Sequence, residues 1–405
     1  MAENQNSLTL RLAGGGYEDL YPWELELEEG LSRLYRGRLT VLSSTFHPME
    51  DFAELLDKKL TLSITQRLGD NRTRRTRWLH GIVSAIACTG VIVGLDKQDC
   101  YRTVFTIEPE LARLRHTLQS ESFFHVPPLD IVETLLNRYG LKGNFSGDYI
   151  DRRKYGPHLL FQEVNEPCLA FLDRLLRIYG LSYTFCHPGP GDSGLADAEL
   201  YFSDGEKFPL SGVVYSDKRK VPAIGRFDFL SKDEGQNQWK MDNWCMENNI
   251  GVDGLTLSAV YPESFRGNSQ WQRGQTRAKD RYHDYTAHFH QYERGTPEAE
   301  MDDDIKLILD ARYLALQYAK SRWEGEAENL ALVPGLVFEL AHVYGRQDRR
   351  VITALVTELA LRARTIWPVD LAAPSDIVQG ECIKARAVCM DFGKDAQRRF
   401  VPINL

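Results

Sequence analysis

Residues 158–185, HLLFQEVNEPCLAFLDRLLRIYGLSYTF, predict a strand, a helix and a second strand in direct succession. Residues 158–164 are a short apolar run, Asn165 offers a side-chain oxygen as N-cap, and Glu166 with Pro167 opens the first turn, where a missing N–H costs nothing. The helix that follows should bury one stripe of 3.6-residue period. The stripe consists of Cys168, Phe171, Leu172, Leu175, Leu176 and Tyr179. No catalytic group is visible in this unit, so we interpret it as a structural element of the fold.

The sequence at the end of this helix is repeated earlier in the chain. Gly180 stands where a left-handed residue ends a helix, and the alternation over residues 181–185 predicts a strand with one buried face. Residues 135–141, LLNRYGL, match residues 175–181, LLRIYGL, at an offset of 40. Two copies do not make a solenoid. The match instead predicts a packed pair of similar helices, each capped by glycine at Gly140 and Gly180.

Length and composition exclude several classes of protein. A chain of 405 residues predicts two to four domains at about 100 to 200 residues each. No apolar run of about 18 residues is present, and the N-terminus lacks a basic and then apolar signal, so we expect no membrane span and folding in the cytosol. A net charge of -8 argues against a general nucleic-acid binder.

Cysteine and arginine clusters suggest structural roles. Seven cysteines, an odd number without a CxxC pair, predict neither disulfides nor structural zinc. Cys168 and Cys186 have no histidine partner in sequence and are interpreted as core thiols. The basic residues of 72–77 are interpreted as a solvated hairpin tip, with an anionic partner as the alternative. They are Arg72, Arg74, Arg75 and Arg77.

The order of elements predicts a mainly β fold with helices, of the α+β class. Residues 7–105 read mostly as strands around a short helix at 48–56, with Gly81 at a close approach or bulge. Helices follow at 110–118 and 129–139, a long helix at 302–323, and a second strand-rich block from 330 to 392. We expect two small antiparallel β-barrels, joined and flanked by helical connector elements. The boundaries are 1–108 for the first barrel, 109–186 for the connector, and 187–405 for the second barrel with its inserted region.

Candidate chemistry is sparse. The chain has no phosphate-binding loop, dinucleotide fingerprint, nucleophile elbow or HExxH motif. His288 and His290 would share one face of a strand and could approach a metal, but no third ligand has a suitable spacing. Asp302, Asp303 and Asp304 are interpreted as a helix start. Residues 14–16, GGG, do not precede a helix, so they are not interpreted as a phosphate cradle. We therefore assign no catalytic, cofactor-binding or metal residue and expect no cofactor.

Several motifs in one order resemble the hub module of VgrG spike proteins of bacterial type VI secretion, which is similar to the baseplate hub of contractile-tailed phages. The stretches that carry the resemblance are HGIV at 80–83, EPEL at 108–111, PLDI at 128–131, the passage 155–185, YHDY at 282–285 and LVPGLVFEL at 332–340. Residues 177–180 depart from the acidic helix end of many members. The resemblance covers roughly residues 8 to 400 and lowers the expectation of metal binding at the histidines.

The resemblance implies a structural hub and no enzyme. Three copies would form a ring, in which two barrels per subunit match a sixfold tube to a threefold spike. Its partners would be further copies, an Hcp-like tube protein, a spike or needle domain, and baseplate proteins or effectors, with neither nucleic acid nor membrane. Assembly would take place in the bacterial cytoplasm, followed by secretion or injection, or incorporation into a virion.

Other interpretations stay open from the sequence. An effector or cell-wall hydrolase domain delivered by such a machine is the alternative, and a carbohydrate- or protein-binding β-module is a third. The sequence does not distinguish a phage from a secretion system, or a stand-alone hub from one cut before its spike domain. It identifies neither cargo nor the residues of a trimer contact.

Overall fold

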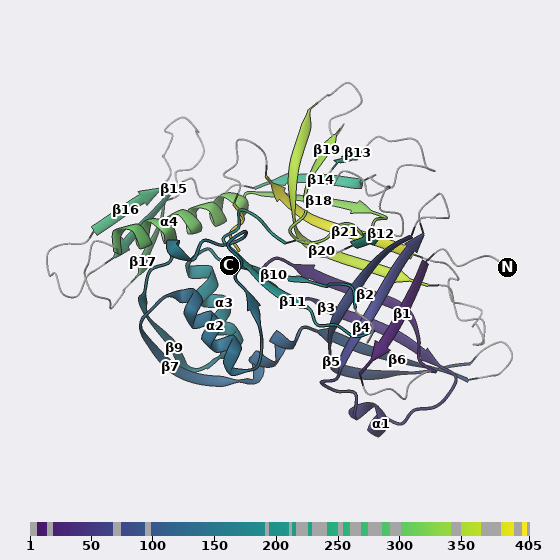
Figure 1. Ribbon diagram of the computed structural model, residues 1–405. Coiled ribbons are helices and arrows are strands. Elements are labelled where there is room, and N and C mark those ends of the chain that lie inside the picture. The colour runs from purple at the N-terminus through teal and green to yellow at the C-terminus, as the bar shows by residue number, and fades with distance from the viewer. Residues whose placement is uncertain are drawn as a thin grey trace.

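The computed structural model describes most of the chain. The described residues are 6–13, 19–67, 74–93, 99–190, 194–209, 213–215, 226–228, 241–249, 254–259, 269–273, 286–291, 301–341, 350–365, 382–392 and 399–402. Strands dominate this part, as predicted, and the main sheet lies beside a compact helical connector (Figure 1). No helix in these ranges is long and apolar enough to cross a membrane.

The largest sheet has 13 strands and combines both ends of the chain. Its main path runs β1-β4-β5-β6-β3-β2-β20-β21-β18-β14, while β12 pairs with β5, and β19 joins β20 to β13. The strands are β1 (Asn6–Leu12), β2 (Tyr21–Gly30), β3 (Arg36–Ser43), β4 (Lys59–Arg67), β5 (Arg74–Val93), β6 (Asp99–Glu108), β12 (Val213–Tyr215), β13 (Arg226–Asp228), β14 (Asp242–Asn248), β18 (Ser321–Ala327), β19 (Val337–Ala341), β20 (Val351–Arg364) and β21 (Cys382–Asp391).

Strand β2 is the junction between the two strand-rich blocks. Leu25 pairs with Leu39 of β3 on one side and with Ala363 of β20 on the other. All three side chains are buried in one hydrophobic cluster, which contains residues from both blocks. Within the described ranges no sheet closes into a barrel, so the predicted pair of barrels is not confirmed. The blocks share one sheet because β2 uses both of its edges.

The connector contains a tandem β-α-β repeat. The first copy is β7 (Leu118–Val126), α2 (Pro128–Arg138) and β8 (Gly143–Asn144), and the second is β9 (His158–Pro167), α3 (Cys168–Ile178) and β10 (Ser182–Cys186). β7 pairs antiparallel with β9. β8 and β10 pair with β11 (Glu199–Ser203), the first in a parallel and the second in an antiparallel sense. The two copies therefore run in opposite directions, as a local twofold axis requires.

Backbone details match at the same offset of 40. His125 and Asn165 have φ of 54° and 61°, and Gly140 and Gly180 have φ of 68° and 64°. Both helices begin after a proline, Pro127 or Pro167. Both end with the same bond, from Leu141 N to Leu136 O at 2.9 Å and from Leu181 N to Leu176 O at 2.8 Å. The predicted pair of glycine-capped helices is confirmed.

The predicted N-cap is wrong. α3 begins at Cys168 after Pro167, and Asn165 lies in β9 with a positive φ. A proline restricts the residue before it to extended conformations, so Glu166 cannot be helical. Instead, the carboxylate of Glu166 accepts the Glu163 N–H at 3.0 Å and the Arg174 Nε–H at 2.8 Å. The carboxylate thus holds the turn before the helix.

Two further helix boundaries differ from expectation. The long helix, α4 (Met301–Tyr318), ends before Trp323, which lies in β18 and is buried. Residues 321–327 alternate between outward and inward side chains, a strand pattern. The helix expected at 110–118 is a 3₁₀ helix, η1 (Glu110–His116), and Leu118 already belongs to β7.

Two local predictions are confirmed. The short helix α1 (Met49–Ala53) buries Phe52 against the first block. Gly81 is a close approach, because a Cβ there would lie 2.7 Å from the backbone oxygen of Glu108.

The helices of the connector share a second hydrophobic cluster with α4. It includes the stripe predicted from the sequence, all of it buried, together with Ile308 and Leu309 of α4. Beside α4 lies a three-stranded sheet of β15 (Gly254–Ala259), β16 (Ser269–Arg273) and β17 (Thr286–Gln291). The molecule therefore has a sheet core and a helical core, and Phe185 of β10 packs against both.

Candidate functional site: the cleft between sheet and connector

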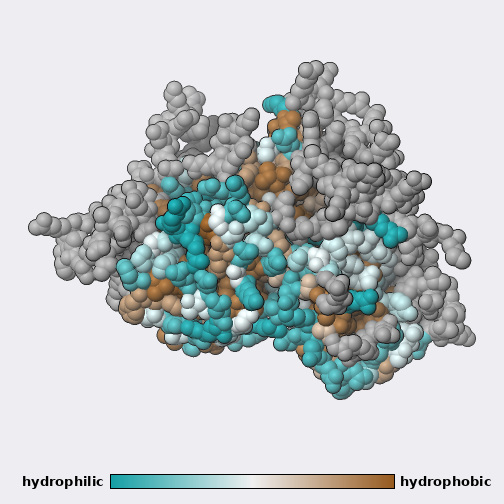
Figure 2. All heavy atoms as spheres, in the orientation of Figure 1, coloured by the Kyte–Doolittle hydropathy of each residue, from teal (hydrophilic) through white to brown (hydrophobic). Residues whose placement is uncertain are grey.

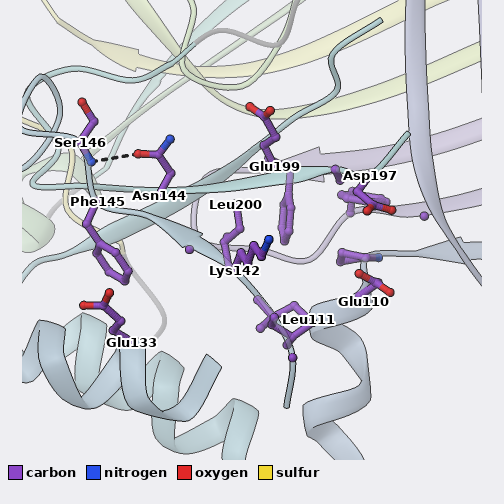
Figure 3. Close-up of a pocket in the computed structure, with 18 of the residues that line it drawn as sticks. Glu110, Leu111, Glu133, Lys142, Asn144, Phe145, Ser146, Asp197, Glu199 and Leu200 are labelled. Atoms are coloured by element: carbon purple, nitrogen blue, oxygen red, sulfur yellow. Dashed lines mark hydrogen bonds between the residues drawn. The ribbon is translucent and has the colours of Figure 1, made fainter. Parts of the chain in front are cut away.

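A cleft of about 800 Å³ lies between the main sheet and the connector. One wall comes from β4, β5 and the start of η1, and the other from the end of α2, β8, and η2 (Arg152–Lys154), with β11 between them. Figure 3 shows Glu110 and Asp197 at one end, Glu133 and Phe145 at the other, and Lys142 with Leu200 between them. The cleft thus lies where the two cores join.

Ion pairs hold much of the charge in the cleft. Lys59 Nζ lies 2.6 Å from Asp197 Oδ1 and 3.7 Å from Glu110 Oε1. Burial disfavours the charged form of Lys59, but the two carboxylates outweigh it and raise the pKa of Lys59. At the other end, Arg152 Nη2 lies 2.8 Å from Glu133 Oε2. The arrangement suits fastening of segments, because each of these three carboxylates already faces a cation.

Residues 187 and 188, directly after β10, are bonded to the main sheet through buried histidines. His80 N–H donates to His187 Nδ1 at 3.1 Å, and His80 Nε2 lies 2.6 Å from the Pro188 oxygen. Tyr35 donates its hydroxyl to the backbone oxygen of His80. Burial, with His80 and Arg77 nearby, lowers the pKa of His187 well below its ordinary value. The neutral imidazoles of His80 and His187 therefore connect β5 to the residues that follow β10.

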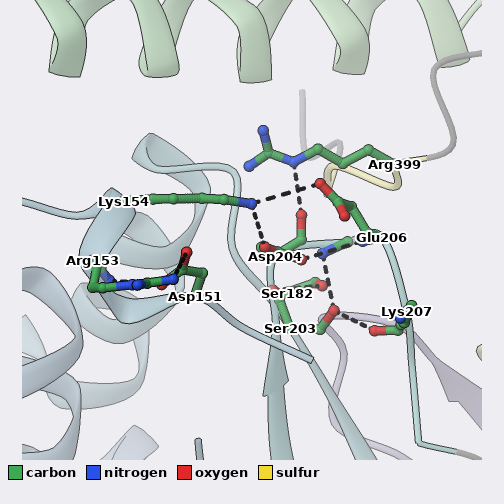
Figure 4. A network of polar contacts seen from close by, with 10 residues as sticks. Asp151, Arg153, Lys154, Ser182, Ser203, Asp204, Glu206, Lys207 and Arg399 are labelled. Carbon is green, nitrogen blue, oxygen red and sulfur yellow. Dashed lines mark hydrogen bonds and ion pairs between the residues drawn. The ribbon is translucent and has the colours of Figure 1, made fainter. Parts of the chain in front are cut away.

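A second polar network fixes the far end of the chain to the connector (Figure 4). Arg399 Nε donates to the Asp204 backbone oxygen at 2.7 Å, and Lys154 Nζ lies 2.9 Å from Asp204 Oδ2. Phe400 N–H donates to the Gly205 oxygen at 2.8 Å. Residues 399 and 400 therefore contact the turn after β11.

The sequence matches the phage tail baseplate hub (GPD) proteins over residues 28–365. The chain belongs to the phage tail baseplate hub family. No curated protein matches the sequence of this hub protein significantly.

Solved structures share the fold of the hub protein at low sequence identity. An E. coli protein, c3393, described as a type VI secretion component similar in structure to the T4 tail proteins gp27 and gp5, has 15% identity and a TM-score of 0.57, over 98% of this chain and 79% of that one. The tail protein of Neisseria meningitidis MC58 has 9% identity and a TM-score of 0.59, over 98% and 99%. A half-lidded Francisella PdpA–VgrG complex has 10% identity and a TM-score of 0.55, over 100% of this chain and 60% of that one. The resemblance to VgrG-type hubs is confirmed for family and fold.

The histidines weighed for metal binding in the hub protein occupy β17. His288 pairs with Thr256 and His290 with Ser258 of β15 in parallel register. Among the described residues, no group of three or more His, Cys, Asp and Glu is placed to hold a metal ion. Asp302, Asp303 and Asp304 lie in the first turn of α4, the predicted helix start.

The core-thiol interpretation is confirmed at both cysteines. Cys168 and Cys186 are buried and free, and burial raises the pKa of Cys186 to about 12. A thiol with so high a pKa is a poor nucleophile. Residues 14–16 lie outside the described ranges.

The hairpin-tip interpretation of the arginines is wrong for two of them. Arg75 and Arg77 are fully buried in β5. Arg77 pairs with the carboxylate of Glu29 on β2 and donates to the Leu332 oxygen at 3.3 Å, while Arg75 bonds the side chain of Asn329. The sequence carried one indication of this burial. Arg75 and Arg77 are two residues apart, and in a strand that spacing places both side chains on the same face. These arginines bond the first block to the loop before β19.

Proposed function

We propose that this protein is a structural hub and adaptor of a contractile injection machine, a type VI secretion system or a phage tail, and that it catalyses no reaction. The observation that carries the proposal is the family match over residues 28–365. Ion-paired carboxylates in the cleft and high-pKa buried thiols favour a mechanical role over a catalytic one.

The working form would be a homotrimer that matches a sixfold tube to a threefold spike. We keep the division into 1–108, 109–186 and 187–405, and propose that the first and last parts act as two barrel-like units, which give a trimer six similar positions. The junction at β2 supports this role, because a continuous sheet transmits force through many backbone hydrogen bonds. The partners would be an Hcp-like tube protein, a spike domain, and baseplate proteins or effectors.

Charged residues on the outer face of the β2 junction support the proposal that this face is exposed to water and is not buried between copies. Glu26 of β2 lies in register with Arg38 of β3 and Arg362 of β20. In one view of the molecule, hydrophilic side chains gather along the lower described surface, with hydrophobic patches among them (Figure 2). The proposed site of action is outside the cell that assembles the machine, after secretion or injection, or in a virion.

Electron microscopy of the purified protein tests this proposal. Class averages should show a ring with threefold symmetry and a six-lobed face. Isolated single copies at a concentration where the protein is well folded would contradict it.

A further inference from the structure

The two copies of the connector repeat have equivalent positions at Gly140 and Gly180. At Gly180 the position is occupied by α4, and at Gly140 it faces the cleft. Gly180 at the end of α3 contacts α4, since a Cβ on Gly180 would lie 2.6 Å from Ala311 Cβ. Gly140 occupies the same position at the end of α2, and a Cβ there would meet nothing within 4 Å. Gly140 lines the cleft. One copy of the repeat therefore holds a helix at its glycine, while the other copy has an open cleft there.

Helix α4 shows which side chains such a position accepts. Ala311 is fully buried at the glycine, and Ile308 and Leu314, three residues to either side, are also buried. A small residue lets the helix backbone approach the glycine. Ile308 belongs to the hydrophobic cluster of the connector, and Leu314 packs with Ala311 and Val401. The filled site thus recognises a small residue within an apolar stripe.

The cleft offers matching features on the other copy. Leu111, Leu141 and Leu200 form the apolar part of its lining. Each is less than one-tenth exposed, so they offer an aliphatic side chain a small apolar area among polar neighbours. Lys142 is exposed, and no acidic side chain of the described chain forms an ion pair with it. This cation would complement an acidic residue beside the small one.

We propose that the cleft is a docking site for an amphipathic helix of a different protein, with Ala, Gly or Ser against Gly140, aliphatic residues three positions away, and an acidic residue facing Lys142. The chain's own helix of this pattern is α4, which carries Asp310 beside Ala311 and is already seated at Gly180. A neighbouring copy therefore has no free α4 to offer. The inference stands whether or not the hub is a trimer.

A labelled peptide with the sequence of residues 301–318, titrated with the full-length protein and followed by fluorescence anisotropy, tests this site. Gly140→Asn should leave the fold intact, because asparagine tolerates a positive φ, and should weaken binding at least about tenfold by filling the cleft. Lys142→Glu should also weaken binding, and the loss of affinity should be larger at low salt than at high salt. Gly194→Asn is the matched control, with φ of 69° outside the cleft lining, and should bind like the parent.

Three results would overturn the proposal. The first is equal affinity for the parent and Gly140→Asn, with both shown to be folded by circular dichroism. The second is photo-crosslinking of the peptide to residues 176–182 rather than 140–146, since the peptide would then replace α4. The third is a fall in oligomeric mass on addition of the peptide, which would assign the cleft to another copy; an unchanged mass with cleft crosslinks supports it. A failure of the trimer alone would show in the mass without peptide.

Discussion

The two glycines of the connector repeat give a matched pair for a stability experiment. Gly140→Ala and Gly180→Ala each place a Cβ on a residue with φ near 65°, at 68° and 64°. That conformation costs a non-glycine residue about 1–2 kcal/mol, offset by about 0.4–1 kcal/mol from the lower entropy of the unfolded chain. Gly140→Ala should therefore lower the free energy of unfolding by about 1 kcal/mol.

At Gly180 a second cost adds to the first. The new Cβ would lie 2.6 Å from Ala311 Cβ, closer than side chains ever pack. Overpacking of this kind costs about 1–3 kcal/mol, so the total for Gly180→Ala should be about 2–4 kcal/mol. Urea unfolding followed by tryptophan fluorescence and far-ultraviolet circular dichroism measures both variants on one scale.

A double-mutant cycle isolates the contact with α4. Ala311→Gly alone should cost about 1 kcal/mol through helix propensity. In the Gly180→Ala background it removes the crowded methyl, so it should cost less or restore stability, with a coupling energy of about 1–3 kcal/mol. Equal losses for Gly140→Ala and Gly180→Ala, together with additivity at Ala311, would refute the assignment of Gly180 as the contact between α3 and α4.

Three further predictions concern a buried leucine of the connector, the buried ion pair of the main sheet and the imidazole of His187. Leu175→Ala should cost about 2–5 kcal/mol in urea unfolding, since Leu175 is fully buried, and should reduce assembly only through folding; a variant that folds normally but fails to assemble would make its stripe an interface. Arg77→Met should cost about 3–5 kcal/mol because it strands the buried Glu29 carboxylate, and the double change Arg77→Met with Glu29→Gln should cost less than the sum; strict additivity would contradict the pair. Since the folded pKa of His187 is depressed, its contribution to stability is present above pH 6.5 and is lost as pH falls below it, by up to about 1.4 kcal/mol per pH unit. The stability of His187→Gln, measured at several pH values, should fall less steeply below pH 6.5 than that of the parent; equal slopes would contradict the shift.

Local patterns predicted the connector well because its elements are decided by neighbours in sequence. The apolar stripe of α3 and the glycines that end α2 and α3 are short-range signals, and each lies where expected. The error at Asn165 was also local. A proline two residues later prevents the helix from starting at Asn165, and that restriction outweighs the capping preference of asparagine.

The main sheet could not be predicted in the same way. The strands themselves carry alternating patterns, but the pairing of Leu25 with Ala363 joins residues from opposite ends of the chain. An alternating strand shows that one face is buried without showing which strands pair with its two edges. The burial of Arg77 follows from the same long-range arrangement, because its partner Glu29 lies on another strand. The cleft at Gly140 arises only where two distant parts of the fold meet.

The oligomeric mass in solution tests the proposed hub function most directly. Light scattering after size exclusion, at high micromolar concentration and with a spike domain added, should give a particle with three copies of the 46.3 kDa chain. A stable mass of 46.3 kDa under those conditions, from protein shown to be folded, would contradict the proposed hub.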